Sequence, residues 1–311
     1  MENGSTTMKD LQLLGLQEME GLKYFYCPLL SVIYLCSLML SILIAFVVST
    51  NRSLHEPMYI LICNLVLNGI VGSSSFFPKL VTDLWTSSKT ISRDGCLTQS
   101  VFIMDCAFFE MMTFSLMAYD RYLAVCHPLH YNVLMTNATV IKVLISFSVA
   151  LFLLLLVTFL LTIRLPLCGT QIKNIFCDNN SIFILACTDT SVNNIYGTIL
   201  AIGLLGSMLI IIVFSYVRTY IACLGLSKES RHKVLYTLAT HLIIFSVFFL
   251  GFFFMFIRHR VGSMNLPVSA HVGLSMPALV VPPLMNPLIF GVRTKALKIK
   301  MGHLFKSWID F

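Results

Sequence analysis

Seven long apolar stretches run through the chain, and they constrain its fold more than any other feature of the sequence. They are residues 25–49, 58–82, 97–119, 140–163, 195–224, 235–257 and 267–290. Each meets or nearly meets the length of about 20 apolar residues that a helix needs to cross the core of a bilayer. The sequence therefore predicts an all-α membrane protein whose single domain, 25–290, is a seven-transmembrane helix bundle.

The composition excludes an ordinary soluble domain. Of the 311 residues 57% are hydrophobic and only 11% are charged, and the mean hydropathy is +0.86. Two short segments, 1–24 and 291–311, flank the bundle. In the second, bases and apolar residues fall on opposing helix faces, which predicts an amphipathic helix and tail along the membrane surface.

The distribution of Lys and Arg predicts the orientation. One side of the membrane has twelve bases against four acids, and the other side is nearly neutral. Basic loops stay in the cytoplasm, so we expect 1–24 outside and 291–311 inside, in the plasma membrane. Asn3 begins a glycosylation sequon on the outer side. We attribute the net charge of +7 to this topology and to membrane lipid, and assign no role to nucleic acid.

Four of the ten cysteines lie on the predicted outer side: Cys96, Cys168, Cys177 and Cys187. They suffice for two disulfides on an oxidising face, and spacing alone leaves three pairings open. Three of the four lie in the long connection after the fourth stretch. A bridge from this connection to Cys96 would hold a lid over the bundle.

Two acids, Asp105 and Glu110, interrupt the third apolar stretch. An ionisable group at membrane depth is costly, so its presence is a hypothesis of function by default. For Asp105, a functional group and a packed, hydrogen-bonded acid are equally good interpretations. For the deeper Glu110 we favour function, as an ion or switch site.

An aromatic stripe in the sixth stretch ends at a cation. Helical spacing puts Phe249, Phe252, Phe253, Phe256 and Arg260 on one face. Such stripes more often face lipid or core, but an apolar wall with one fixed polar group describes a small-molecule site. Arg260 would then favour an anion such as a carboxylate. The alternative is that Arg260 simply meets water or lipid headgroups.

The third stretch ends in an adjacent acid and base, Asp120 and Arg121. We interpret them as an ion pair at the membrane boundary that acts as a latch, since a partner protein could compete for the arginine. The seventh stretch has clustered prolines and Asn286 in 282–287, which predicts a bendable helix.

Five segments match one known family in order and at its spacing. They are 54–59 (LHEPMY), 117–131 (MAYDRYLAVCHPLHY), 215–216, 237–241 and 282–287 (PPLMNP). Together they resemble the olfactory (odorant) receptors, a branch of the rhodopsin-like G-protein-coupled receptors, and the likeness runs from about residue 10 to residue 300. Segments 259–262, 287–295 and 68–69 look more like the fish-like, class I branch, and 68–69 is similar to teleost members.

The resemblance implies that Cys96 pairs with Cys177 and Cys168 with Cys187. It implies a heterotrimeric stimulatory G protein as partner and cyclic AMP as the output. In that view Arg121 engages the G protein once its contact with Asp120 loosens. The full set of coupling and switch residues implied by the family is Asp120, Arg121, Tyr216, Asn286 and Pro287.

The resemblance also implies an odorant pocket in the outer half of the bundle, beneath the cysteine-pinned connection. Its residues at matching positions are Met104, Phe108, Phe252, Phe256 and Arg260. No cofactor is implied, apart from a structural sodium ion. If such an ion stabilises the resting state, Glu110 has to do more of the binding, because Gly69 stands where the family usually has an aspartate.

Other functions fit the sequence less well. A receptor of the same architecture for a small metabolite in another tissue is the alternative, because sequence does not encode tissue. A channel or transporter would need internal repeats, broken helices or a polar pore lining, whereas the sequence shows no repeat and only Asp105 and Glu110 inside the bundle. An enzyme is not expected, since the sequence has no nucleophile–base pair, P-loop or metal-ligand spacing.

Overall fold

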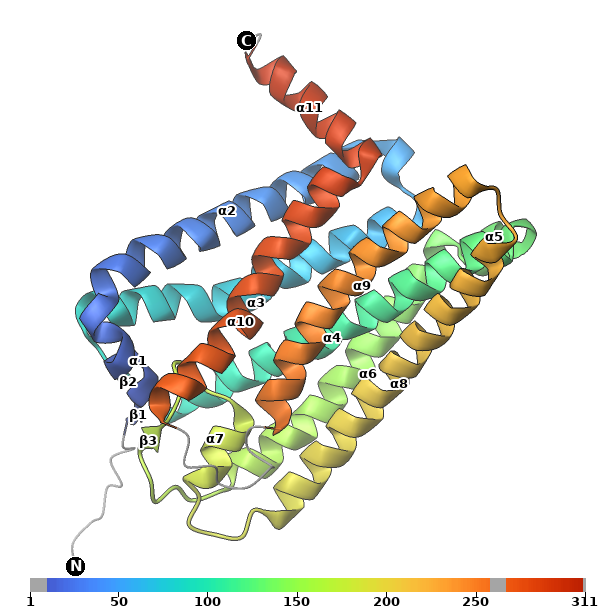
Figure 1. The fold of residues 1–311 in the computed structure, drawn as a ribbon. Helices are drawn as coiled ribbons and strands as arrows, with labels where there is room; N and C mark the ends of the chain where they lie inside the picture. The colour runs from blue at the N-terminus through green and yellow to red at the C-terminus, as the bar shows by residue number, and fades with distance from the viewer. Residues whose placement is uncertain (1–9, 258–266, 310–311) are drawn as a thin grey trace, which may run out of the picture.

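Long helices build the chain in the computed structural model, which describes residues 10–257 and 267–309 (Figure 1). They are α2 (Lys23–Thr50), α3 (Pro57–Thr86), α4 (Arg93–Cys126), α6 (Asn137–Ile163), α8 (Ser191–Leu224), α9 (Lys228–Ile257) and α10 (Val268–Arg293). Each corresponds to one predicted apolar stretch, so the predicted fold class is confirmed.

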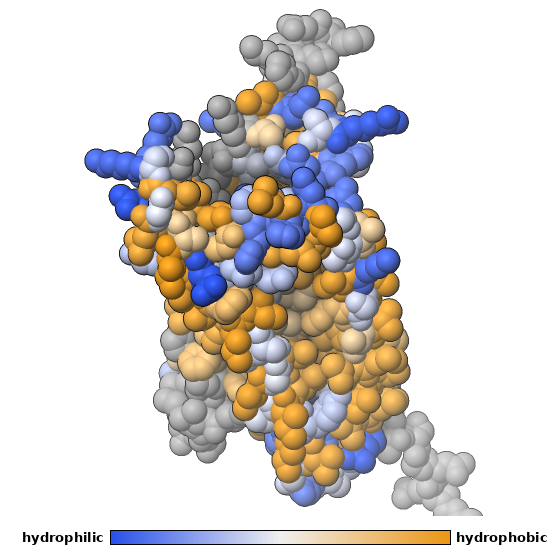
Figure 2. Space-filling model, turned by 90° about the vertical axis from the view of Figure 1, so that its right-hand side faces the viewer, coloured by the Kyte–Doolittle hydropathy of each residue, from blue (hydrophilic) through white to orange (hydrophobic). Residues whose placement is uncertain are grey.

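The bundle has an apolar side and polar ends. Over the described residues, six helices are long and apolar enough to cross a membrane, and α9 adds a seventh long helix of 30 residues. Figure 2 shows hydrophobic residues along the side of the bundle and hydrophilic residues gathered toward its ends. Helix α4 is the most deeply buried of the six, which makes it the central helix.

Local chemistry explains where these helices begin. Ser92 Oγ accepts a hydrogen bond from the backbone N–H of Gly95 at the start of α4, and Thr136 Oγ1 accepts one from Thr139 at the start of α6. Such caps satisfy N–H groups that lack a partner within the helix. Helix α3 begins instead with Pro57, whose missing N–H costs nothing in a first turn.

One end of the bundle, called the lid end, carries a small sheet that the sequence analysis missed. Its strands are β1 (Leu11–Leu13), β2 (Thr90–Ile91) and β3 (Gln171–Ile172), in the order β2-β1-β3. Strand β1 runs antiparallel to β2, where Leu11 pairs with Ile91, and parallel to β3, where Gln12 pairs with Gln171. Short helices complete this end: α1 (Leu14–Met19), η1 (Glu20–Leu22) and α7 (Asn179–Ile184).

The opposite end, called the tail end, carries η2 (Arg52–Leu54), α5 (Pro128–Leu134) and α11 (Lys295–Ile309). Helix α11 lies in the segment for which we predict an amphipathic helix, and it points away from the bundle (Figure 1). Leu297 is buried against the bundle core, whereas Lys298 and Lys300 are exposed. This division of faces is the one expected of an interfacial helix.

Close packing joins the helices. A Cβ atom added to Gly251 on α9 would lie 3.0 Å from the Cβ of Ala278 on α10, so the two backbones approach through small residues. Polar side chains link α3 to α4, where Asn64 Nδ2 donates to Thr113 Oγ1 at 3.0 Å and Asn68 Nδ2 donates to the carbonyl of Cys106 at 2.9 Å.

Candidate functional site

A cavity of about 150 Å³ lies in the lid half of the bundle. Four of the five residues predicted to bind ligand line it, namely Met104 and Phe108 from α4 and Phe252 and Phe256 from α9. The fifth, Arg260, lies outside the described residues. The fold therefore brings together side chains that are about 150 positions apart in the sequence.

Aromatic rings form one wall of this cavity. The rings of Phe108 and Phe252 lie 5.5 Å apart, centroid to centroid, within the range of favourable aromatic pairs. The predicted aromatic stripe is divided, since Phe249 and Phe253 do not line the cavity and instead stack on each other. Phe253 is 43% exposed on the side of the bundle. Phe252 and Phe253 are neighbours in sequence, so their side chains point about 100° apart around the helix, and only Phe252 faces the cavity.

The polar lining comes from α4 and the lid. Ser100 and Glu110 of α4 line the cavity together with Asp178, Asn179 and Asn180. The sequence analysis did not select the three lid residues, although they directly follow the lid cysteine that the family pairs with α4. Their side chains are acids and amides, so the described lining has no cation.

Glu110 connects the cavity to α10. It is only 7% exposed, and its Oε1 atom accepts a hydrogen bond from Asn286 Nδ2 at 2.5 Å. Asn286 Oδ1 is buried without a hydrogen-bond partner in the described part of the chain, and Pro287 follows it inside the helix. Asp105, the other acid of α4, is half-buried and does not line the cavity.

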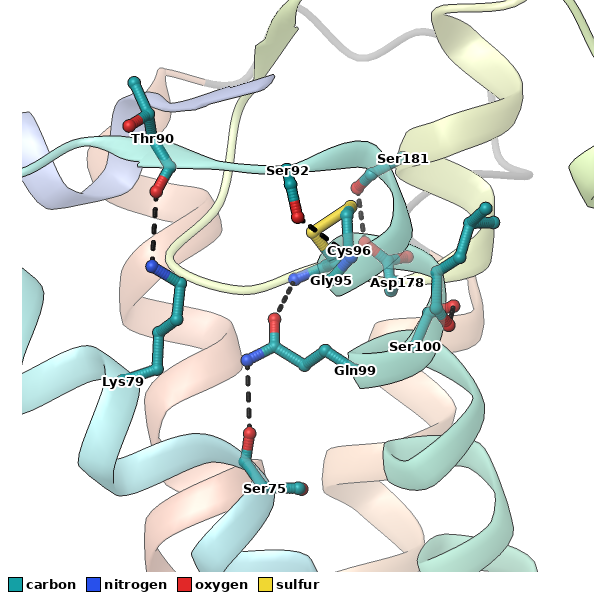
Figure 3. The surroundings of a disulfide bond; sticks show 12 residues. Ser75, Lys79, Thr90, Ser92, Gly95, Cys96, Gln99, Ser100, Asp178 and Ser181 are labelled. Atoms are coloured by element: carbon teal, nitrogen blue, oxygen red, sulfur yellow. Dashed lines mark hydrogen bonds between the residues drawn. A yellow bond between two sulfur atoms is a disulfide. The ribbon is translucent and has the colours of Figure 1, made fainter. Parts of the chain in front are cut away.

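Two disulfides pin the lid, Cys96–Cys177 and Cys168–Cys187, which are the pairs that the resemblance implies. Gln99 adds a clamp beside the first one. Its Oε1 accepts from the backbone N–H of Cys177 at 2.9 Å, and its Nε2 donates to the carbonyl of Ser75 at 3.3 Å (Figure 3). The lid is thus tied to both α3 and α4.

At the tail end, the predicted ion pair between Asp120 and Arg121 is wrong for this structure. Asp120 Oδ1 instead accepts a hydrogen bond from the Tyr131 hydroxyl at 2.7 Å. Within the described chain Arg121 makes no ion pair, and its Nε atom is buried without a hydrogen-bond partner. Helix α5 folds back beside the end of α4 and supplies the tyrosine, which the local sequence pattern did not reveal.

Tyr216 lies on α8 and packs, partly buried, against the core of the tail half. The hydroxyl of the neighbouring Ser215 is buried without a partner among the described residues. The residues that the resemblance assigns to the switch therefore lie at two levels. Asp120, Arg121 and Tyr216 are near the tail end, and Asn286 with Pro287 is level with Glu110.

The sequence model of the family described as "Olfactory receptor" matches residues 30–307. This chain belongs to the olfactory receptor family. Human Olfactory receptor 52D1 is 32% identical to it over 303 residues, which cover 96% of this chain and 95% of the relative. Human Olfactory receptor 51E1 is 33% identical over 94% and 92% of the two chains, and human Olfactory receptor 52P1 is 34% identical over 86% and 84%.

This olfactory receptor is therefore a G-protein-coupled receptor for odorants, a multi-pass protein of the plasma membrane and not an enzyme. Its described residues contain no group of three or more His, Cys, Asp or Glu side chains placed to hold a metal ion. Its assignment to the fish-like branch stays a prediction.

Proposed function

We propose that this receptor binds a small odorant in the cavity between α4, α8 and α9 and then activates a stimulatory G protein, which raises cyclic AMP. The observation that supports the location is that Met104, Phe108, Phe252 and Phe256 line one cavity beneath the disulfide-pinned lid. An apolar wall with few polar groups is typical of small-molecule sites. Elsewhere, an engineered cavity of about 150 Å³ holds benzene, so a volatile of that size suits this one.

We place the lid end outside the cell and the tail end in the cytoplasm. The distribution of Lys and Arg supports this orientation, and so do two disulfides at the lid end, because disulfides persist on oxidising faces. Asn3, the predicted glycosylation site, then lies outside.

The tail end offers a contact surface for the G protein. Helix α5 exposes Leu129 to 90% and Val133 to 75%, next to Asp120 and Arg121 at the end of α4. Exposed apolar side chains that cluster beside a polar rim favour protein contacts. In this proposal Arg121, which makes no ion pair in the described chain, binds the G protein. Helix α8 and the Asn286–Pro287 segment rearrange at the same time.

A matched pair of α9 variants tests the cavity. Phe252→Ala removes a ring that packs on Phe108, whereas Phe253→Ala removes a neighbouring ring that lies outside the cavity. Cells expressing each variant are screened with acids, amines, alcohols and aldehydes, with cyclic AMP as readout. We expect Phe252→Ala to raise the half-maximal odorant concentration at least about tenfold, the equivalent of roughly 1.4 kcal/mol, and Phe253→Ala to leave it unchanged. Equal effects would place the odorant elsewhere.

The same panel tests the ligand class. We propose a preference for small acidic odorants, supported by the sequence, in which Arg260 follows the cavity-lining Phe256 by four residues. Because the described lining has acids and no cation, a carboxylate would need this arginine. Arg260→Ala should lower acid potency and spare alcohols. If Arg260→Ala left the potency of acids unchanged, the proposed role of Arg260 would be wrong. If the wild type responded more strongly to amines than to acids, the proposed ligand class would be wrong.

A sodium ion at Glu110 is the remaining part of the proposal. The oxygens that support it are the Glu110 carboxylate and the unpartnered Asn286 Oδ1, so water would have to complete the shell. An ion that binds only the folded state raises the unfolding temperature. Sodium, compared with a larger monovalent cation, should stabilise the wild type and not Glu110→Gln. If sodium raised the unfolding temperature of the wild type and of Glu110→Gln equally, the ion would not bind at this site.

A further inference from the structure

A second hollow, called the α3–α4 groove, opens on the outside of the bundle near the lid end, and its volume is about 830 Å³. Its lower part is apolar, with Val71 on α3 and Phe102 on α4. Its upper part carries the hydroxyls of Thr90, Ser92 and Thr98. Figure 3 shows this upper part, with Lys79 on α3, Gln99 on α4, and Thr90 and Ser92 on the segment that joins the two helices.

The lower part of the groove opens on the apolar side of the bundle, where a membrane leaflet would lie. Val71 is 47% exposed and Phe102 is 46% exposed on the apolar side of the bundle. Along α3 the groove runs from Lys79 to Ile70, or about 14 Å at about 1.5 Å per residue. Since the hydrocarbon core is about 30 Å thick, this length matches a single leaflet. A membrane lipid is therefore the natural occupant.

The charges of the groove are already compensated. Lys79 Nζ donates to both carboxylate oxygens of Asp83, at 2.9 and 2.7 Å, and to the carbonyl of Thr90 at 3.2 Å. An ammonium group has three N–H donors, so none is left over for a phosphate. No other charged residue lines the groove in the described chain. The groove thus favours a neutral lipid over an anionic one.

Thr98 points to the kind of headgroup. Threonines elsewhere in these two helices, such as Thr86 on α3 and Thr113 on α4, donate to the carbonyl four residues earlier. The exposed Thr98 makes no such bond and has no other hydrogen-bond partner in the described chain. Its hydroxyl is therefore free to donate to, or accept from, the hydroxyl of a bound molecule.

We propose that the α3–α4 groove binds a sterol, a neutral lipid with one hydroxyl and a flat, rigid apolar body. The hydroxyl pairs with Thr98 at the upper end, and the ring system lies against Phe102 and Val71 below. A phospholipid, with a charged phosphate and two flexible chains, fits these features less well.

The groove and the proposed odorant cavity lie beside different faces of one turn of α4. Gln99 lines the groove and holds the lid through the backbone N–H of Cys177, and the next residue, Ser100, lines the cavity. A sterol packed on Gln99 would stabilise the hydrogen bonds of Gln99 and therefore the position of the lid. This coupling between the groove and the cavity rests on the proposed function, and we expect sterol depletion to shift odorant potency.

Photolabelling of the purified receptor tests binding without any odorant. The receptor, in phosphatidylcholine nanodiscs, is irradiated with a photoactivatable sterol, and the labelled peptides are identified. Thr98→Trp and Val71→Trp fill the groove, and Val149→Trp is the control on α6, where Val149 is 56% exposed. Surface expression and unfolding temperature show that each variant folds.

We expect label on residues 70–79 or 95–102 in the wild type and in Val149→Trp, and loss of about tenfold in at least one folded groove variant, the equivalent of roughly 1.4 kcal/mol of affinity. Unchanged labelling of both groove variants would overturn the proposal. Equal labelling of these residues by a phospholipid photoprobe would also overturn it, because the groove would then hold bulk lipid. An odorant response that fails while labelling succeeds would count against the proposed function alone.

Discussion

Tyr131 is the residue that decides the state of the acid–base pair at the tail end. It lies on α5, outside the membrane-spanning helices, and its hydroxyl donates to the buried Asp120. Burial and then this hydrogen bond raise the pKa of the Tyr131 phenol. A raised pKa keeps the phenol protonated, so Tyr131 keeps its proton and the bond to Asp120 throughout the physiological pH range.

Removing this hydroxyl should change signalling. Tyr131→Phe leaves Asp120 without its donor, and the freed carboxylate can then turn to the neighbouring Arg121. We expect lower basal and maximal cyclic AMP, with a loss of stability of about 1–3 kcal/mol because a buried acceptor loses its partner. Tyr119→Phe is the control. Tyr119 precedes Asp120 on α4, is 37% exposed, and its hydroxyl makes no hydrogen bond to Asp120 in the described chain. Unaltered cyclic AMP in Tyr131→Phe would show that Arg121 does not depend on this contact.

At the scale of single residues, the sequence predicted which side chains meet in the cavity better than it predicted their bonds. The family resemblance implied Met104 and Phe108 as cavity residues, and they lie one turn apart on α4, so they share one face of the helix. The bond between Glu110 and Asn286 joins residues 176 positions apart, and no local pattern contains it.

Among the elements, α9 and α10 share a contact that depends on one glycine. Gly251 leaves room for Ala278, whose Cβ would lie 3.0 Å from an added Cβ, and both helices line the cavity. The contact therefore sets how closely the aromatic wall approaches the proline-rich helix.

A larger residue at this contact should destabilise the bundle. Gly251→Leu overpacks the interface, at a cost of about 1–3 kcal/mol, and we expect a lower unfolding temperature and weaker odorant responses. Gly203→Leu on α8 is the control, because nothing lies within 4 Å of a Cβ added there. Thermal unfolding in detergent compares the two variants. If the unfolding temperature fell by a similar amount in both variants, the loss in Gly251→Leu would not come from the close contact between α9 and α10.

For the whole molecule, length and hydropathy were enough to predict the bundle. A chain in hydrocarbon has to satisfy its backbone hydrogen bonds internally, so a long apolar stretch has one main solution, a helix. The lid end obeys no such rule. Its strands have two or three residues each, too few for an alternating pattern, and they pair only because distant segments meet there. The lid over the cavity was therefore less predictable than the helices that line it.

The place of β1 in the sheet has a consequence for how the receptor is made. Strand β1 is the central strand, yet it pairs with β3, whose residues are synthesised about 160 positions after it. At about 5–20 residues per second, this partner arrives roughly 8–30 seconds after the strand itself. Until then Leu11 and Leu13, both buried in the finished fold, belong to a strand that can pair only with β2, and the sheet is incomplete. The lid end closes late in synthesis, and an exposed β1 marks a receptor that is not yet complete.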